Sequence, residues 1–465
     1  MMGELRLTEA ADRFGGTLIN PDGCFDSISI DSRSVMPGDL FVAINGENFD
    51  SHHFIPDIAK KISGAVVSKP DTSLNIPQWV VEDTSLALGN LAKLRREKFA
   101  GQLIAITGSS GKTSVKELLV SILSVTKFVH GTDGNLNNHL GVPLTLLKMR
   151  AEIDIAVIEM GASAVGEIDY LCSLAKPNIA LINNAQSAHI EGFGSMAAIA
   201  KAKAEIYSSL DSDGIAILNA DEIWISQWLD IIGDRPCLKF SVEDDNADIF
   251  AKEIIETGSG CYRFILCLHS RLGSFAGEQF LTLKMPGLHA VSNALAAAAC
   301  AVAAGSSLSS IIKGLSAVES APGRLQRKNL KDSYTVIDDS YNANPDSFEA
   351  AIDVLCCCGG YRIVVMGDMS ELGNYAEEAH QNIGRYAKKM GIDSFFGVGA
   401  LSKLATDIFG GDHFQNQDQL LDALVNKIDF LKIPVTEVTI LVKGSRSSHM
   451  ERIAQALINQ ESMSC

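Results

Sequence analysis

Residues 103–114 read Leu103-Ile104-Ala105-Ile106-Thr107-Gly108-Ser109-Ser110-Gly111-Lys112-Thr113-Ser114. A β-type apolar run enters a glycine-containing loop, and the segment 115–121 that leaves it has a helix-forming composition. Small residues let backbone N–H groups close around phosphates, while the positive end of the helix faces their negative charge. Lys112 is placed to reach the outer phosphates, and the Thr113 hydroxyl to coordinate Mg²⁺. The stretch therefore predicts a site for ATP or GTP formed by Gly108, Ser109, Ser110, Gly111, Lys112, Thr113 and Ser114.

The bulk composition is that of a large acidic enzyme. Its 465 residues suggest about three domains. The net charge of −17 argues against a nucleic-acid partner, because a phosphate backbone is bound by clustered basic residues. The amino terminus lacks the apolar core of a secretory signal, and the longest run of small apolar residues, 294–304, is too short to span a bilayer. We therefore expect a cytoplasmic protein that neither binds nucleic acid nor inserts into a membrane. We also expect it to be a monomer.

Alternating strand and helix patterns divide the chain into three α/β units. Apolar strands such as 103–107 and 155–159 are separated by helical segments, and continuous apolar strands of this kind predict a parallel sheet covered on both faces. An earlier alternating segment, 25–30, predicts one strand. The predicted units are a small α/β domain at 1–83, a central P-loop domain with a parallel sheet at 84–321, and a Rossmann-like α/β domain at 322–465.

Polar residues that follow the central strands are candidates for the site, because ligands of such sheets bind beyond the carboxyl ends of the strands. Glu159 ends the strand 155–159, where a carboxylate suits Mg²⁺ or the orientation of a water. His189 follows the next strand, and neutral imidazole is a ligand for divalent metals. An ordinary strand-end acid and an ordinary loop histidine are the alternatives at these two positions.

Six motifs are spread in order over nearly the whole chain. They are TGSSGKT at 107–113, GNLNNHLGVPLTLL at 134–147, AHIEGFG at 188–194, DDSYNANP at 338–345, GDMSELG at 367–373 and VKGSR at 442–446. Together they resemble the Mur ligase family. One segment departs from the family pattern, since Asn183-Asn184-Ala185-Gln186-Ser187 stands where the family more often has a threonine, an isoleucine-glycine pair and a proline.

The resemblance implies both a fold and a reaction. By this resemblance, residues 1–83 are expected to bind the UDP part of the substrate. Residues 84–321 are expected to form the ATP-binding domain, and residues 322–465 a ligase domain. The motifs are most similar to the member that joins D-alanyl-D-alanine to UDP-N-acetylmuramoyl-tripeptide, a step of peptidoglycan precursor synthesis. In that reaction ATP first activates the tripeptide carboxylate as an acyl phosphate, which the dipeptide amine then attacks, and ADP and phosphate are released.

The resemblance also assigns the charge-compensating residues. Lys112 serves the β- and γ-phosphates, Thr113 and Glu159 hold one Mg²⁺, and His189 is a ligand of a second Mg²⁺. The main task of such a site is to neutralise the anionic reacting groups.

A lysine carbamate is the further cofactor that the resemblance implies. Lys203 lies in a stretch of helical composition, and its spacing to Tyr207 fits the family better than that of Lys201. Reaction with carbon dioxide turns the cation into an anion that can hold Mg²⁺, and it requires the neutral amine. A solvated lysine on an amphipathic helix is the alternative.

Other residues receive roles from the resemblance alone. For some of them a structural role is open: Asn293 as a polar residue at a helix start, Arg33 as a solvated arginine in a turn, and Lys443 as a strand cap. The assigned ATP contacts are Asn293, Arg324, Asp339, Tyr341 and Asn342; the substrate contacts are Ser32 and Arg33 for UDP, Asn137, Asn138 and His139 for the muramyl peptide, and Lys443 and Arg446 for the dipeptide carboxylate.

Three other functions are compatible with parts of the sequence. A P-loop kinase or GTPase, or a non-catalytic nucleotide-binding protein, shares the phosphate loop but does not account for the motifs near the carboxyl terminus. A sister ligase that adds one amino acid, such as a folate-type polyglutamate ligase, shares the architecture. The stretches 137–143 and 338–345 argue against the sister ligases.

Overall fold

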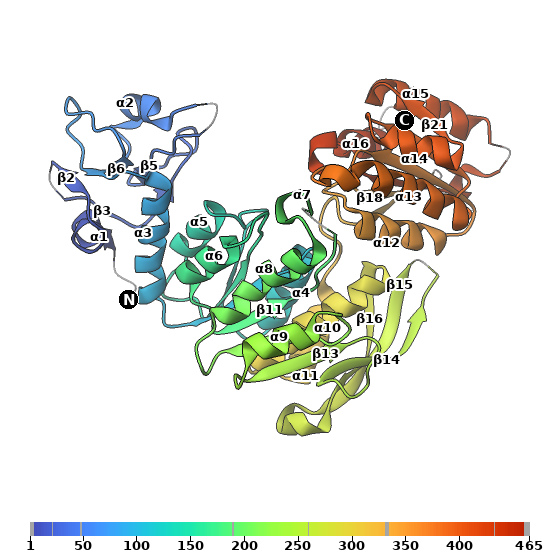
Figure 1. The fold of residues 1–465 in the computed structure, drawn as a ribbon, viewed down its shortest axis with the longest axis horizontal. Helices are drawn as coiled ribbons and strands as arrows, with labels where there is room; N and C mark the ends of the chain where they lie inside the picture. The colour runs from blue at the N-terminus through green and yellow to red at the C-terminus, as the bar shows by residue number, and fades with distance from the viewer. Residues whose placement is uncertain are drawn as a thin grey trace.

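The computed structural model describes residues 4–20, 22–46, 49–187, 190–258, 260–330, 334–431 and 433–459. In this part of the chain, three lobes follow one another from the blue amino-terminal end to the red carboxyl-terminal end (Figure 1). Each lobe is built on its own sheet, of five, nine and six strands respectively. The predicted α/β fold with three domains is therefore confirmed, while the boundaries between the domains stay predictions. In the described residues, no helix combines the length and apolarity that crossing a membrane requires.

The first lobe contains a mixed sheet in the order β2-β7-β6-β5-β4. The predicted strand 25–30 is wrong as a single element. Phe25 pairs antiparallel with Leu5, whereas Ile28 pairs parallel with Leu40, so the segment is divided between two sheets. The elements of this lobe are β1 (Leu5–Arg6), α1 (Leu7–Phe14), β2 (Thr17–Ile19), β3 (Cys24–Phe25), β4 (Ile28–Ser29), β5 (Leu40–Val42), α2 (Ile55–Ile58), β6 (Gly64–Val67) and β7 (Gln78–Val80).

Helix α3 (Thr84–Lys98) joins the first lobe to the second. At its start, the Thr84 hydroxyl donates a hydrogen bond of 2.7 Å to the carbonyl of Ala43 in the first lobe. At its end, the Arg96 guanidinium donates a hydrogen bond of 2.6 Å to the carbonyl of Ala175 in the second. The helix is therefore fixed to both lobes.

The central sheet has the order β16-β15-β14-β13-β12-β11-β8-β10-β9. Its strands from β9 to β14 are parallel neighbours, and β15 and β16 extend it antiparallel. The strands are β8 (Gln102–Thr107), β9 (Val129–Gly131), β10 (Ile155–Glu159), β11 (Ile179–Ile182), β12 (Ile215–Asn219), β13 (Cys237–Ser241), β14 (Ile249–Glu256), β15 (Cys261–Leu268) and β16 (Gly277–Pro286).

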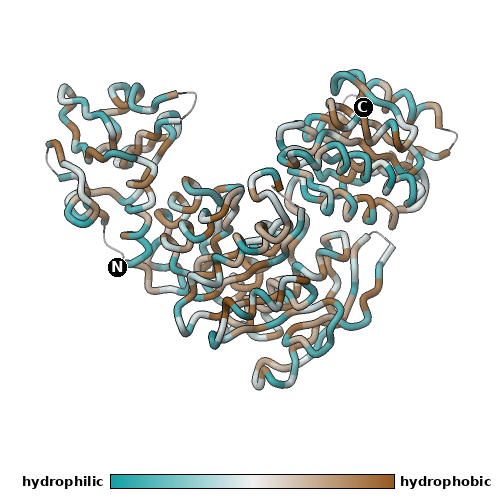
Figure 2. The backbone as a smooth tube through the Cα atoms, in the orientation of Figure 1, coloured by the Kyte–Doolittle hydropathy of each residue, from teal (hydrophilic) through white to brown (hydrophobic). Residues whose placement is uncertain are grey.

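Helices cover both faces of the central sheet, as the apolar strands predict. Alternate residues of β8 belong to different cores: Leu103 and Ala105 to one, Ile104 and Ile106 to the other. Figure 2 shows apolar segments along the strands inside the lobes. The first core is completed by α5 (Gly141–Leu147), α6 (Glu167–Ala175), α7 (Ile190–Phe193), α8 (Met196–Ser208) and α9 (Ile225–Ile232), and the second by α4 (Lys112–Leu123), α10 (Leu288–Ala303) and α11 (Leu308–Ala317).

The third lobe contains a sheet in the order β17-β18-β22-β19-β20-β21, parallel except for β17. Its elements are β17 (Gln326–Asn329), β18 (Thr335–Asp339), α12 (Pro345–Cys356), β19 (Tyr361–Gly367), α13 (Ala376–Lys389), β20 (Ser394–Val398), α14 (Ser402–Phe409), β21 (Asp412–Phe414), α15 (Gln417–Asp429), β22 (Val438–Lys443) and α16 (Glu451–Asn459).

Candidate active site

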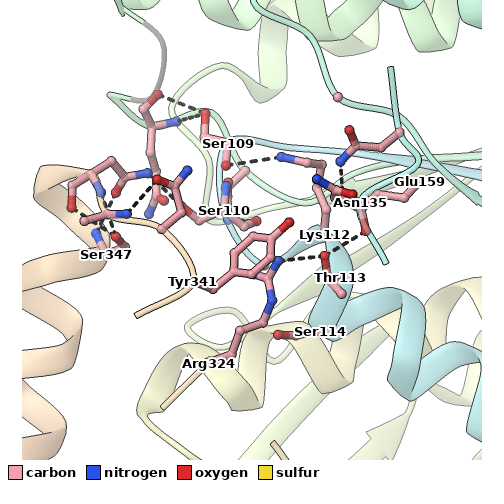
Figure 3. Close-up of a pocket in the computed structure, with 18 of the residues that line it drawn as sticks. Ser109, Ser110, Lys112, Thr113, Ser114, Asn135, Glu159, Arg324, Tyr341 and Ser347 are labelled. Carbon is pink, nitrogen blue, oxygen red and sulfur yellow. Dashed lines mark hydrogen bonds between the residues drawn. The ribbon is translucent and has the colours of Figure 1, made fainter. Parts of the chain in front are cut away.

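A cleft of about 970 Å³ lies where the central lobe meets the third. Its walls come from the loop between β8 and α4, the end of β10, the start of α10 and the segment after β18 (Figure 3). Many residues selected from the sequence meet here although they are far apart along the chain. Those that line the cleft are Ser109, Ser110, Gly111, Lys112, Thr113, Ser114, Asn137, Asn138, His139, Glu159, Asn293, Arg324, Asp339, Tyr341, Asn342, Lys443 and Arg446.

The loop before α4 has the geometry of a phosphate loop. Gly111 adopts a left-handed conformation with φ of 78°, which favours glycine, and α4 begins directly after it. The Lys112 ammonium donates hydrogen bonds to the carbonyls of Gly108 at 2.7 Å and Ser109 at 3.3 Å. Burial lowers the pKa of Lys112, the Arg324 cation lowers it further, and the Glu159 carboxylate opposes both. An anionic ligand in the cleft would therefore gain a closely placed cation.

Glu159 lies at the bottom of the cleft and is only 2% exposed. Its Oε2 accepts a hydrogen bond of 2.8 Å from the Thr113 hydroxyl, and its Oε1 accepts one of 2.8 Å from the Asn137 amide. Arg324 donates from Nη2 to Thr113 Oγ1 at 2.9 Å (Figure 3). The Thr113 hydroxyl and the Glu159 carboxylate are thus adjacent oxygen donors, the chemistry that Mg²⁺ prefers.

His189, the ligand predicted for the second Mg²⁺, lies outside the described residues. Within the described part of the chain, no group of three or more His, Cys, Asp or Glu side chains is arranged to hold a metal. Thr113 and Glu159 are two such donors, and Mg²⁺ is commonly bound by one or two carboxylates together with nucleotide phosphates.

The third lobe supplies cations and polar groups to the cleft. The Arg324 guanidinium lies 3.9 Å from the centre of the Tyr341 ring, which fixes it opposite the phosphate loop. Lys443 forms a buried ion pair with Asp339 and donates a hydrogen bond of 3.0 Å to the carbonyl of Asn342. Its ammonium is therefore already engaged at the end of β22.

Arg446 is the more available cation at this end of the cleft. Its side chain is 65% exposed and lies 3.4 Å from a Glu451 oxygen. A smaller cavity of about 330 Å³ adjoins it and is lined by Ser109, Asn342, Ala343, Asn344, Ser370, Glu371, Leu372, Ser445, Arg446 and Ser447.

Lys203 is buried in α8 and is 2% exposed. Among the described residues, its ammonium has no hydrogen-bond or ion-pair partner. Burial lowers the pKa of Lys203 well below its usual range, and the nearby Lys112 cation lowers it further. Lys201, by contrast, is exposed. Tyr207 anchors the same helix, because its hydroxyl donates to the carbonyl of Ile217 at 2.5 Å.

Some predicted residues do not line the cleft, among them Gly108 and Lys203, and others are engaged elsewhere. Ser32 and Arg33 belong to the first lobe, where Arg33 pairs with Asp31 at 2.7 Å and holds the pKa of that carboxyl at about 2. Asn138 lines the cleft, yet its side-chain oxygen also caps α5 by accepting from the Gly141 N–H at 2.9 Å.

Contacts between the lobes include residues that the sequence did not single out. The Asn344 amide donates to Ser110 Oγ at 3.1 Å, and the Asp346 carboxylate accepts from the Ser187 N–H at 3.0 Å. Asn344 followed by Pro345 is a sequence signal for a helix start, and α12 does begin there with a capping box. That signal contains no information about the partner across the cleft.

Comparison with known proteins gives matches along the whole chain. Models described as Mur ligase family, catalytic domain, as Mur ligase middle domain and as Mur ligase, glutamate ligase domain match residues 25–105, 106–301 and 323–446. The UDP-N-acetylmuramoyl-tripeptide–D-alanyl-D-alanine ligase of Escherichia coli strain K12 is 42% identical over 465 residues, 100% of both chains.

Solved structures show the same likeness. A crystal structure of MurF from Acinetobacter baumannii has a TM-score of 0.91 and 37% identity, covering 98% of this chain and 99% of that one. The MurF ligase of Thermotoga maritima in complex with ADP has a TM-score of 0.79 and 26% identity, covering 92% of this chain and 96% of that one.

Proposed function

This chain belongs to the Mur ligase family, and we propose that its central cleft joins D-alanyl-D-alanine to UDP-N-acetylmuramoyl-tripeptide while ATP is cleaved to ADP and phosphate. The full-length identity to ligases of that name supports this function. The observation that carries it is the meeting of the phosphate loop, Glu159 and Arg324 in one cleft. The product is a peptidoglycan precursor. We place the reaction in the cytoplasm, and the free thiols of the described cysteines fit a reducing compartment.

The proposed reaction has two steps. A carboxylate oxygen of the tripeptide attacks the γ-phosphorus of ATP, the bond to the bridging oxygen breaks, and ADP leaves. The amine of D-alanyl-D-alanine then attacks the acyl carbon, and the carbon–oxygen bond to phosphate breaks as the amine loses a proton. Most of the reacting groups are anionic, so stabilisation of negative charge is the main work of the site.

The side chains of the cleft divide this work. Lys112 leaves its loop carbonyls to bind the outer phosphates, and Arg324 reaches them from the opposite wall. Thr113 and Glu159 would hold a Mg²⁺ ion, with His189 on a second. Bound Mg²⁺ would supply further positive charge against the phosphates and the carboxylate. Asn293 contacts the adenine base, and Asp339, Tyr341 and Asn342 hold the third lobe in place around the nucleotide.

Lys203 is proposed to carry a carbamate. Its amine attacks carbon dioxide, a nitrogen–carbon bond forms, and one proton is released. The buried position without a described partner supports this reaction, because it favours the neutral amine that carbamylation needs. The resulting anion would sit close to Lys112 and would remove the repulsion between the two lysines.

The substrate contacts follow the order of the lobes. Ser32 and Arg33 are proposed to bind the UDP part in the first lobe, and Asn137, Asn138 and His139 the muramyl peptide. Arg446, with Lys443 behind it in its ion pair, is proposed to attract the dipeptide carboxylate. The small cavity beside Arg446 carries the hydroxyls of Ser370, Ser445 and Ser447, which suit an anionic end group.

The metal role of Glu159 gives a direct prediction. In Glu159→Ala, the Mg²⁺ concentration for half-maximal activity should rise by about tenfold or more, because a carboxylate oxygen donor is lost. Activity measured over a Mg²⁺ series tests this. Glu117→Ala is the control, since Glu117 lies on α4 with its side chain 45% exposed. A wild-type Mg²⁺ profile in Glu159→Ala would remove Glu159 from the metal site.

The role of Arg446 predicts an effect on one substrate only. Arg446→Ala should raise the KM for D-alanyl-D-alanine by about tenfold with little change in kcat, because a charge-assisted contact to the carboxylate is lost. The C-terminal amide of the dipeptide is the matched probe. The wild-type protein should bind the amide more weakly than D-alanyl-D-alanine itself. Arg446→Ala should use the amide no worse than D-alanyl-D-alanine. An equal preference for the acid in both proteins would place its carboxylate elsewhere.

The function itself is tested by leaving out one substrate at a time. ADP and phosphate should form only when both the UDP-linked tripeptide and D-alanyl-D-alanine are present. A kinase, a GTPase or a non-catalytic binding protein would not show this double requirement. Equal turnover with a single amino acid or with glutamate in place of the dipeptide would favour a sister ligase. Tripeptides with diaminopimelate or lysine at the third position define the acceptor.

A further inference from the structure

Two adjacent asparagines after β11 hold the phosphate loop through Ser110. The Asn184 side chain accepts from the Ser110 N–H at 2.9 Å and donates to the Ser110 carbonyl at 3.1 Å. Asn183 Nδ2 donates to the same carbonyl at 3.0 Å. Both asparagines belong to the segment that departs from the family pattern, and together they fix one loop residue with three hydrogen bonds.

Asn183 has one contact that Asn184 lacks. Its Nδ2 also donates to Oδ1 of Asn293, in α10, at 2.9 Å. Both hydrogens of the Asn183 amide nitrogen are thus used, whereas its oxygen is buried without a hydrogen-bond partner in the described part of the chain. Turning the amide over would place its oxygen against the Ser110 carbonyl oxygen, which cannot donate. The hydrogen-bond network therefore assigns the orientation of Asn183.

The orientation of Asn183 determines that of Asn293. Because Asn293 Oδ1 accepts from Asn183, the Asn293 amide nitrogen is directed away from it. Asn293 is 5% exposed, lines the cleft, and its nitrogen has no hydrogen-bond partner among the described residues. The turn at Gly111 closes over the pair, since a Cβ there would lie 2.6 Å from both Asn183 Nδ2 and Asn293 Oδ1. A buried amide donor is thereby kept available beside the phosphate loop.

We propose that Asn183 is a positioning residue that sets which end of the Asn293 amide meets the nucleotide base. This rests on the proposed function, in which Asn293 contacts adenine. An asparagine amide matches the adenine edge by donating to N7 and accepting from the N6 amino group. With Asn293 held by Asn183, its nitrogen donates to N7, and the second lone pair of its oxygen stays free for the amino group. Guanine presents a carbonyl oxygen instead, which this oxygen repels.

The competing explanation is that Asn183 only supports the loop. Asn184 separates the two explanations, because it holds Ser110 equally well but makes no hydrogen bond with Asn293 in the described structure. Loss of loop support weakens binding of every nucleotide alike. Loss of the fixed orientation of the Asn293 amide weakens the binding only of nucleotides whose base carries both the N7 acceptor and the N6 amino group.

The experiment is isothermal titration of the full-length protein with ADP and with 7-deaza-ADP, in which a C–H group replaces the N7 acceptor. Wild type should bind ADP about tenfold more tightly than 7-deaza-ADP, as expected for one hydrogen bond in a buried site. In Asn183→Ala the ratio of the affinities for ADP and 7-deaza-ADP should fall below about threefold. Asn184→Ala should bind both nucleotides more weakly but keep the wild-type ratio. GDP should bind relatively better to Asn183→Ala than to wild type.

Asn183→Ala could lose the ratio because its fold is disturbed, so the melting temperature of each variant is measured without nucleotide. A second variant, Asn183→Asp, tests the same contact with a smaller change in shape. Asn183→Asp keeps the shape but cannot donate, and its carboxylate accepts from a turned-over Asn293 amide, so it too should lose the ratio. Asn293→Ala separates the failures. A ratio near one in wild type, or one retained in Asn293→Ala, removes the base contact and this inference with it. A ratio lost in Asn293→Ala but retained in both Asn183 variants refutes the role of Asn183 alone.

Discussion

Lys112→Ala should lower kcat by at least about a thousandfold, equivalent to ~4 kcal/mol of transition-state stabilisation. The Lys112 ammonium lies at the start of α4 and bonds only to loop carbonyls of Gly108 and Ser109 in the described structure. Burial also lowers the pKa of Lys112. A charge held in this way interacts strongly with the phosphoryl group in transfer.

Single-turnover formation of ADP measures this effect without interference from product release. Lys127→Ala is the matched control, because Lys127 follows the same helix and donates to the Ala304 carbonyl at 2.8 Å without lining the cleft. It should turn over at nearly the wild-type rate. A Lys112→Ala protein that folds and retains a tenth of the wild-type rate would show that the phosphate loop is not the site of transfer.

Lys203→Ala should be nearly inactive, with a loss of about a thousandfold or more. In the proposed account, the change removes an anion that faces the metal sites and leaves a small buried space in α8. Small carboxylates such as formate or acetate should enter this space and restore part of the activity, because they replace the carbamate oxygens. The rate is measured as a function of carboxylate concentration.

Lys201 provides the control for Lys203, because it lies in the same helix but is exposed. Lys201→Ala should be close to wild type and should not respond to added carboxylate. If Lys203→Ala kept most of its activity, both the carbamate and the metal arrangement built on it would have to be abandoned. An inactive Lys203→Ala protein that no carboxylate rescues would point to a packing role for the lysine instead.

The strands and helices of the two larger lobes could be predicted closely from sequence. Residues 155–159 form β10 with the predicted bounds. Long apolar strands that alternate with helices constrain the structure from both sides of the sheet. The first lobe was harder, because short alternating segments do not reveal their partners. The division of 25–30 between two sheets depends on pairing with Leu5 and Leu40, which are distant in sequence.

The residues of the cleft could be selected from motifs, but not their partners. Nothing near Lys443 in the sequence predicts its burial against Asp339, which follows from the parallel pairing of β18 with β22. The contact between Asn344 and Ser110 depends on how two lobes meet. Such partners arise from tertiary arrangement, whereas a phosphate loop is a local structure that its own residues determine.

Activation of the tripeptide carboxylate as an acyl phosphate is tested most directly by isotope labelling, which shows whether a carboxylate oxygen is transferred to phosphate. UDP-linked tripeptide labelled with ¹⁸O in its terminal carboxylate is incubated with ATP and D-alanyl-D-alanine, and the phosphate and the peptide product are examined by mass spectrometry. An acyl-phosphate intermediate predicts one labelled oxygen in the phosphate for each pentapeptide formed, because the carboxylate oxygen that attacks the γ-phosphorus leaves with it. Unlabelled phosphate, or phosphate released without pentapeptide, would contradict it.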